Sequence, residues 1–256
     1  MTTEPDCTQA IYLYGFVLSN RVVPPILGVD DVHCVELYAC NGLIAVVSLV
    51  LLVDFESLDC EDNARYLAWL TPRACRHSAV IDKFMEQGAI YPLSFGTLFS
   101  NVNALEQTMR QRSDEVSASL QHIADCQEWS LEVSLDRNQA VEGLLEEELS
   151  AGRISLPEAA GRRHLEEQKL RRNLHAQLSD WMESALVAIY ESIQPMIRDS
   201  CQRKLTDNKV MHWAFLIPKE AVAMFQQRID QIATDYQPYG FSFRVTGPWA
   251  AYSFAR

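Results

Sequence analysis

Residues 43–53 read LIAVVSLVLLV, the longest apolar run in the chain, and they follow the turn dipeptide Asn41-Gly42. The run covers roughly half of the 20 residues that a membrane-spanning helix needs, so it does not predict a membrane protein. Its Val and Ile content and the preceding turn favour a strand that is buried on both faces. Residues 33–40 lie across the turn, and the sequence therefore predicts an antiparallel pair of strands at the centre of a sheet.

Further elements of this sheet are expected on either side of the pair. Residues 11–18 and 90–93 each predict a strand, and Gly96 supplies the turn after the second. A helix should begin near residue 61, and Thr71-Pro72 reads as the cap and first residue of a fresh helix. One apolar face continues across that joint, through Tyr66, Leu70, Ala74, His77, Ile81 and Phe84. Another helix is expected from about residue 103, with the apolar face Leu105, Met109, Val116, Leu120 and Ile123, which gives a sheet with helices on one face.

The second half of the chain predicts another mixture of strands and helices. Residues 129–135 alternate apolar and polar, as in a half-buried strand, and a long helix should run from Pro157 until Pro195 breaks it. A strand at 209–217, a helix at 218–235 and a strand at 240–246 follow. The elements do not alternate regularly, which favours an α+β fold. We expect an N-terminal domain at 1–126, a C-terminal α+β domain at 127–246 and an aromatic tail at 247–256.

The tail reads GPWAAYSFAR, and its aromatic residues are Trp249, Tyr252 and Phe254. Chain ends are usually frayed and polar, whereas clustered aromatic side chains are costly to expose and mark contact surfaces. Gly247-Pro248 should end the last strand. We expect the three aromatic residues either to bind a partner or to fold back on the C-terminal domain, and release of the tail during assembly would allow both.

The composition excludes several classes of partner. The 256 residues are 48% hydrophobic and 22% charged, as in a globular protein. A net charge of −12 and a pI near 4.9 disfavour nucleic acid and anionic membranes, because Lys and Arg dominate binding to both. Seven scattered cysteines without a CxxC pair, and no recognisable signal peptide, indicate reduced thiols and a cytoplasmic location.

No motif in the sequence predicts chemistry. The ten glycines form no phosphate-binding loop, and none of the six histidines pairs with another at helical spacing. We therefore expect no metal, no cofactor and no catalytic residue. A Cys nucleophile with a distant His base stays open, because such partners need not be neighbours in sequence.

One basic segment stands out in this acidic chain. Residues 162–172 contain Arg162, Arg163, Lys169, Arg171 and Arg172 against Glu166 and Glu167. The segment either docks a partner, with Arg162, Arg163 and Arg171 as candidates, or is a solvated helix face. In the second case Glu167 and Arg171 should form an i,i+4 ion pair.

Several blocks together resemble the GvpF/GvpL family of gas vesicle proteins. They are YLYGFV at 12–17, HSAVIDKFMEQGAIYPLSFGTLF at 77–99, EWSLEV at 128–133, GRRHL at 161–165 and the tail, in the family's order. Five positions depart from the family's pattern: Ala250 and Ala251 replace prolines, Ser94 and Glu132 replace basic residues, and His164 replaces an aromatic hydroxyl.

The resemblance implies a fold and a function. The expected fold has an N-terminal ferredoxin-like domain, an α+β C-terminal domain and a tail. The expected function is that of a non-enzymatic accessory or minor structural protein, in the cytoplasm and the gas vesicle, which acts in assembly by binding the shell protein GvpA and other Gvp proteins. The alternative is a small-molecule-binding or enzymatic ferredoxin-like α+β protein, since one fold hosts many functions.

Overall fold

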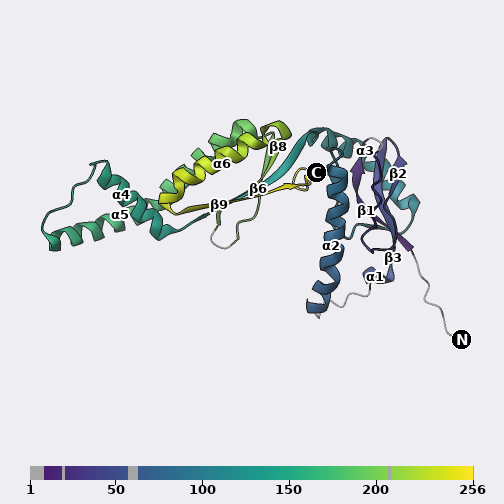
Figure 1. The fold of residues 1–256 in the computed structure, drawn as a ribbon, viewed down its shortest axis with the longest axis horizontal. Coiled ribbons are helices and arrows are strands. Elements are labelled where there is room, and N and C mark those ends of the chain that lie inside the picture. Colours follow the sequence, from purple (N-terminus) through teal and green to yellow (C-terminus); the bar gives the residue numbers. More distant parts are fainter. Residues whose placement is uncertain (1–8, 19–20, 57–62, 207–208, 256) are drawn as a thin grey trace. The chain divides into compact units, whose positions relative to one another are not determined.

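The computed structural model describes residues 9–18, 21–56, 63–206 and 209–255 (Figure 1). The chain divides into two compact units. Unit 1 is Met1–Glu128 together with Pro248–Arg256, and unit 2 is Trp129–Gly247. Unit 2 is therefore inserted into unit 1, and both connections lie within strands.

Unit 1 contains one sheet of short and long strands. The strands are β1 (Gln9–Val17), β2 (Glu36–Cys40), β3 (Leu43–Leu51), β4 (Tyr91–Pro92) and β5 (Leu98–Phe99), in the order β2-β3-β1-β4, with β5 also paired to β1. The predicted pair across Asn41-Gly42 is β2–β3, which is antiparallel. The centre of the sheet is β3–β1, however, because β1 is buried from its second residue onward.

A bulge in β1 adapts this central strand to its neighbours. Leu13 pairs with Val47 and Gly15 with Val46, so one extra residue stands between them. A Cβ atom at Gly15 would lie 2.4 Å from the carbonyl oxygen of Tyr91 on β4. Only glycine permits this approach, which is the physical reason for its place in the strand.

The helices of unit 1 are α1 (Val53–Glu56), α2 (Asn63–Met85) and α3 (Val102–His122). Phe84 of α2 packs in a core with Tyr12 and Val46. Val102 and Leu105 of α3 lie beside Ile11, whose side chain points to the opposite face of β1. Helices thus cover both faces, where the sequence predicted one, because β1 and β3 are apolar on both faces.

The helix α2 runs without interruption through Pro72. The prediction of a fresh helix at Thr71-Pro72 was therefore wrong. Proline removes one N–H donor from the helix, yet the apolar face from Tyr66 to Phe84 continues in register on both sides. Tertiary packing of this face outweighs the local break signal.

Unit 2 holds a second sheet with helices on one face. Its strands are β6 (Cys126–Leu135), β7 (Asp199–Gln202), β8 (Lys209–Pro218) and β9 (Phe241–Trp249), in the order β7-β8-β6-β9. Its helices are α4 (Arg137–Ser150), α5 (Ala160–Ile193) and α6 (Val222–Tyr236), with 3₁₀ turns η1 (Gln194–Met196), η2 (Lys219–Ala221) and η3 (Gln237–Tyr239). Leu131 and Phe215 of the sheet pack against Ile189 and Phe225 of the helices. The sequence did not predict α4 or β7.

The last strand continues through Gly247-Pro248 to Trp249. The expected end of the strand at this dipeptide was therefore wrong. Gly247 adopts φ 150°, which glycine tolerates, and β9 is an edge strand. Proline is acceptable at an edge, because its missing N–H need not face a neighbouring strand.

Both sheets share one strand order. In each, the second, third, first and fourth strands along the chain lie side by side, the order of a β-α-β-β-α-β ferredoxin-like sheet. The described residues 21–35, between β1 and β2, contain no helix, whereas α4 and α5 fill the equivalent connection in unit 2. The predicted α+β class is confirmed.

Candidate functional site

The aromatic tail packs on unit 1. Ala250, Ala251 and Phe254 are buried, and Ala250 joins the core that contains Tyr12 and Phe84. The expectation that a folded-back tail would lie on the C-terminal domain was wrong. Unit 1 offers an aromatic and polar docking site that the sequence did not reveal.

His77 of α2 forms the centre of this docking site. Its Nδ1 lies 2.9 Å from the Tyr12 hydroxyl and its Nε2 lies 3.1 Å from the Leu93 carbonyl oxygen. The Tyr252 hydroxyl of the tail is 3.3 Å from the same Nε2. The imidazole also stacks on the Tyr14 ring, with centroids 5.6 Å apart.

These contacts define the protonation of His77. A carbonyl oxygen can only accept, so Nε2 carries the proton and Nδ1 accepts from the Tyr12 hydroxyl. The backbone N–H of Gly96 donates to the oxygen of that same hydroxyl, which fits this assignment. Burial lowers the pKa of His77 to about 4, so the ring is neutral at neutral pH. Burial also raises the pKa of Tyr252 to about 12.

A buried carboxylate anchors the next tail residue. Glu128, only 1% exposed, accepts hydrogen bonds from the backbone N–H of Ser253 at 2.8 Å and from the Ser253 hydroxyl at 2.9 Å. Hydrogen bonds to a charged acceptor are stronger than neutral ones. Because Glu128 is the last residue of unit 1 before the chain enters unit 2, the bond joins the two ends of the insertion.

The three predicted tail residues differ in exposure. Trp249 is 49% exposed and Tyr252 is 43% exposed, whereas Phe254 is only 7% exposed. Phe254 therefore serves the core of unit 1 in this conformation. Trp249 and Tyr252 present aromatic surface to solvent.

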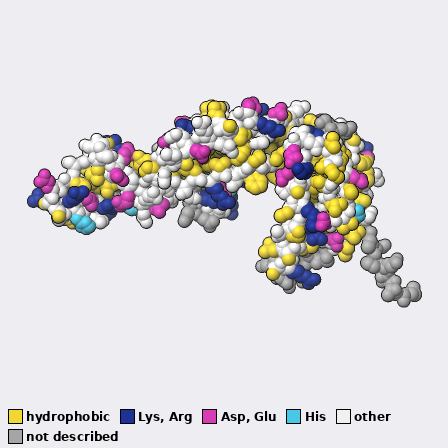
Figure 2. Space-filling view, viewed as in Figure 1, with side chains coloured by type: hydrophobic (Ala, Val, Ile, Leu, Met, Phe, Trp, Pro, Cys, Tyr) yellow, Lys and Arg dark blue, Asp and Glu magenta, His cyan; other side chains and the backbone are white. Residues whose placement is uncertain are grey.

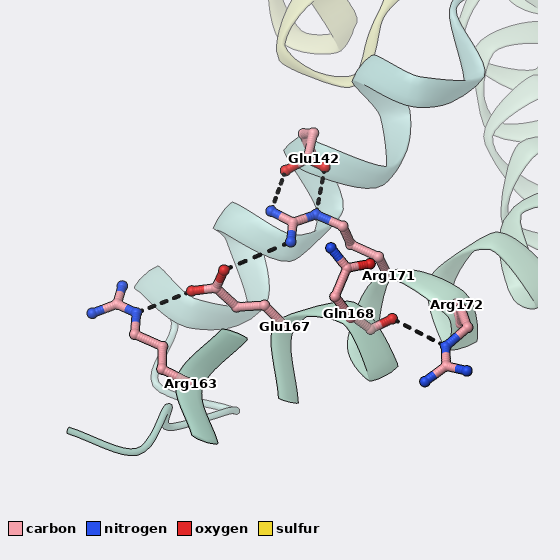
Figure 3. Close-up of polar contacts among 6 residues, drawn as sticks. All are labelled: Glu142, Arg163, Glu167, Gln168, Arg171 and Arg172. Carbon is pink, nitrogen blue, oxygen red and sulfur yellow. Dashed lines mark hydrogen bonds and ion pairs between the residues drawn. The ribbon is translucent and has the colours of Figure 1, made fainter. Parts of the chain in front are cut away.

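The predicted basic residues lie on the hairpin formed by α4 and residues 160–177 of α5 (Figure 3). Arg171 donates from Nε and Nη2 to the two carboxylate oxygens of Glu142 on α4, at 2.6 and 2.9 Å. This hydrogen-bonded pair lowers the pKa of Glu142. The bidentate pair joins the two helices of the hairpin.

Glu167 bridges two of the arginines along α5. It accepts from Arg163 at 3.0 Å and lies 3.6 Å from Arg171, the ion pair expected for a solvated helix face. Arg162 is exposed beside them. Acidic and basic side chains alternate over this hairpin (Figure 2). The structure thus brings Arg163 and Arg171 together in unit 2, whereas the tail residues from Pro248 onward belong to unit 1.

The largest cavity among those described in unit 2, about 750 Å³, lies beside the start of α4 and is lined by Asp136, Arg137 and Lys209 together with uncharged residues including Ser134 and Gly240. The Asp136 carboxylate accepts from the backbone N–H groups of Asn138 and Gln139, so it caps α4. Lys209 pairs with Glu132 at 3.1 Å. Asp136 and Lys209 therefore serve the fold.

Within the described ranges, no three His, Cys, Asp or Glu side chains gather as ligands for a metal ion. None of the described helices combines the length and the apolar composition that crossing a bilayer requires.

A family model described as gas vesicle synthesis protein GvpL/GvpF matches residues 10–256 of this sequence. The chain belongs to the GvpL/GvpF family. The match spans both units and the tail, and the family has a role in gas vesicle formation.

Two curated relatives support this membership. Gas vesicle protein L of a Streptomyces species is 25% identical over 228 residues, which covers 84% of this chain and 80% of the relative. Gas vesicle protein F1 of Halobacterium salinarum is 21% identical over 250 residues, covering 96% and 93%.

Two crystal structures share the fold. GvpF from an Anabaena species has a TM-score of 0.70 at 18% identity and covers 97% of this chain and 96% of its own. GvpF from Microcystis aeruginosa has a TM-score of 0.68 at 19% identity, with coverage of 96% and 99%.

Proposed function

We propose that this protein is a non-enzymatic accessory or minor structural protein that acts in gas vesicle assembly by binding the shell protein GvpA and other Gvp proteins. The observation that supports this best is the family match from residue 10 to residue 256. We place its action in the cytoplasm and at the gas vesicle.

The physical basis of the proposal is protection of apolar surface. A small hydrophobic shell subunit buries its apolar face only when it polymerises, and such exposed surfaces aggregate beforehand. A partner with a net charge of −12 would remain well solvated while it covers that face.

Two surfaces of the protein suit this task. The tail offers the half-exposed rings of Trp249 and Tyr252, and aromatic side chains are enriched where proteins bind one another. The hairpin of α4 and α5 offers Leu165, which is 68% exposed, beside the exposed Arg162. We propose these, with Arg163 and Arg171, as the partner-binding residues, and Phe254 as the residue that holds the tail in place.

Co-expression with the shell protein tests the proposal. We expect the tagged full chain to retain the shell protein through purification, and the double variant Trp249→Ala with Leu165→Ala to retain several-fold less. Exposed Leu67 provides the control, because Leu67→Ala removes apolar surface from a site that we do not propose. A shell protein that is never retained, together with normal vesicles after deletion of the gene, would contradict the proposed function.

A further inference from the structure

A second cavity of unit 2, of about 400 Å³, lies where α5 faces the end of α6 and the turn η3. Three aromatic side chains line it: Trp181, Tyr236 and Tyr239. From α5 the small residues Ser184, Ala185 and Ala188 also line it, which leaves room between the rings and the helix.

The rings hold a fixed geometry. The centroids of Trp181 and Tyr239 are 5.5 Å apart with an interplanar angle of 52°, and those of Tyr236 and Tyr239 are 6.4 Å apart at 61°. Trp181 and Tyr236 both pack against Phe241 of the core, at 5.7 and 5.3 Å. The inclined rings therefore form a preorganised wall.

Carboxylates border the same cavity. Glu147 and Asp235 both line it. One Glu147 oxygen accepts from the Tyr239 hydroxyl at 2.8 Å, and the other is 2.8 Å from an Arg153 guanidinium nitrogen. These two partners lower the pKa of Glu147, so the group is anionic at neutral pH. Asp235 accepts from the Gln231 amide at 2.8 Å.

This combination of groups selects for a cation. Aromatic faces attract a guanidinium or ammonium group through their quadrupole, and a bordering carboxylate adds direct attraction. A free anion would be repelled by Glu147 and Asp235. A planar guanidinium stacks on aromatic rings better than a compact ammonium does.

We propose that the cavity bounded by Trp181, Tyr239 and Asp235 binds a basic side chain, preferentially arginine, of a partner protein. The identity of that partner rests on the proposed function, since a gas vesicle protein would supply the side chain. Within the chain itself, Arg153 already pairs with the lining residue Glu147 and with its neighbour Glu148, which shows that Glu147 can bind a guanidinium group.

A pair of labelled peptides tests the cavity directly. One is a short helical Ala/Leu peptide with a central arginine, and the other carries the neutral isostere citrulline at that position. Fluorescence anisotropy with the full chain measures both dissociation constants. We expect the arginine peptide to bind about five- to tenfold more tightly, as a cation–π contact supported by a carboxylate would give.

Matched variants locate the effect. Glu147→Gln with Asp235→Asn keeps the hydrogen-bond acceptors for Tyr239 and Gln231 but removes both charges, and it should reduce the preference for arginine to less than about twofold. The control Glu220→Gln with Asp230→Asn removes the same charge from exposed positions of unit 2 and should keep the preference. Equal binding of the two peptides by the original protein, or the same loss in the control, overturns the proposal.

The partner assignment has its own readout. If the charge-removing variant retains several-fold less co-expressed shell protein than the control does, the cavity contributes to that contact. If both retain it equally, the assignment of the cavity to this partner is wrong. A preserved arginine preference, with no shell protein retained by the original chain and normal vesicles after deletion of the gene, leaves the cavity established and contradicts the proposed function instead.

Discussion

His77 links the fold of unit 1 to pH. Its pKa is about 4 in the folded protein, against about 6.5 for a histidine in an unfolded chain. Above pH 6.5 His77 is neutral in both the folded and the unfolded protein, so the stabilisation that the neutral ring provides is fully present. As the pH falls from 6.5 to 4, only the unfolded state takes up a proton, and the free energy of unfolding decreases by ~3 kcal/mol.

The variant His77→Gln should lack this part of the pH dependence. It should be less stable than the original protein at pH 7, because the contacts to Tyr12 and Leu93 change, but the difference should shrink by ~2–3 kcal/mol near pH 4.5. Urea unfolding at the two pH values measures it. The control is His164→Gln, at an exposed position. An equal difference at both pH values would mean that His77 does not carry the effect.

Sequence reasoning placed His77 on a buried helix face but not in a site. Its spacing with Tyr66, Ile81 and Phe84 shows the face, whereas its hydrogen-bond partners come from residues 12, 93 and 252. Contacts so distant in sequence leave no periodic signal. The buried position of Glu128 could not be predicted either, because a single acidic residue at the start of a strand is usually expected to be exposed.

At the scale of elements, long periodic segments could be predicted and short ones could not. The strand at 43–50, the helix from residue 103 and the long helix before Pro195 are all present. The helix α4 was missed because it is rich in charged residues on several sides and buries only Ala140, Val141 and Leu145. Strand β7 has four residues, too few to establish an alternation.

The place of the tail in the structure differs from the prediction, because its last aromatic residue, Phe254, is buried in unit 1. Phe254→Ala should lower the free energy of unfolding of unit 1 by about 3–4 kcal/mol, since it removes a buried aromatic side chain. Trp249→Ala, at a position half exposed, should cost less than about 1 kcal/mol and reduce retention of the shell protein instead. Chemical unfolding of the two variants measures the contrast. Equal and small costs would show that the tail is not part of the core.

The hairpin of α4 and α5 should open locally when its bidentate pair is removed. The first buried residue of α5 is Leu178, so residues 160–177 depend on α4 and on contacts such as Arg171–Glu142. Arg171→Gln should therefore speed amide hydrogen exchange in residues 160–172, with little change in the melting temperature. Arg172→Gln is the control, because Arg172 donates to the backbone carbonyl oxygen of Gln168 on its own helix (Figure 3). Equal exchange in the two variants would argue against the pair.

At the scale of the whole molecule, the α+β class followed from the irregular alternation of elements. The common strand order of the two sheets could not be predicted in this way, because pairing between strands from distant segments depends on three-dimensional packing. The candidate surfaces were found only in part. The tail and the basic segment stand out by composition, whereas the arginine-binding cavity is built from residues of α4, α5, α6 and η3 that no motif joins.

The insertion of unit 2 predicts that the two units differ in autonomy. Residues 129–247 contain a complete core and should unfold cooperatively as an isolated fragment. Residues 1–128 alone lack Ala250 and Phe254 and should be markedly less stable. Replacing 129–247 by a flexible linker should restore that stability. Thermal unfolding, followed by circular dichroism, compares fragment 129–247, fragment 1–128 and the linker variant. A fragment 1–128 as stable as the linker variant would contradict the role of the tail.

The bond between Glu128 and Ser253 also has a consequence for the order of synthesis. Segments usually fold in the order in which the ribosome makes them, at about 5–20 residues per second, so roughly 120 intervening residues impose a delay of about 6–24 s. During that interval unit 1 has its sheet but not Ala250 or Phe254, while all of unit 2 is made. The core of unit 1 is therefore begun first and completed last. A chain whose synthesis stops before Phe254 lacks one of the side chains that complete this core.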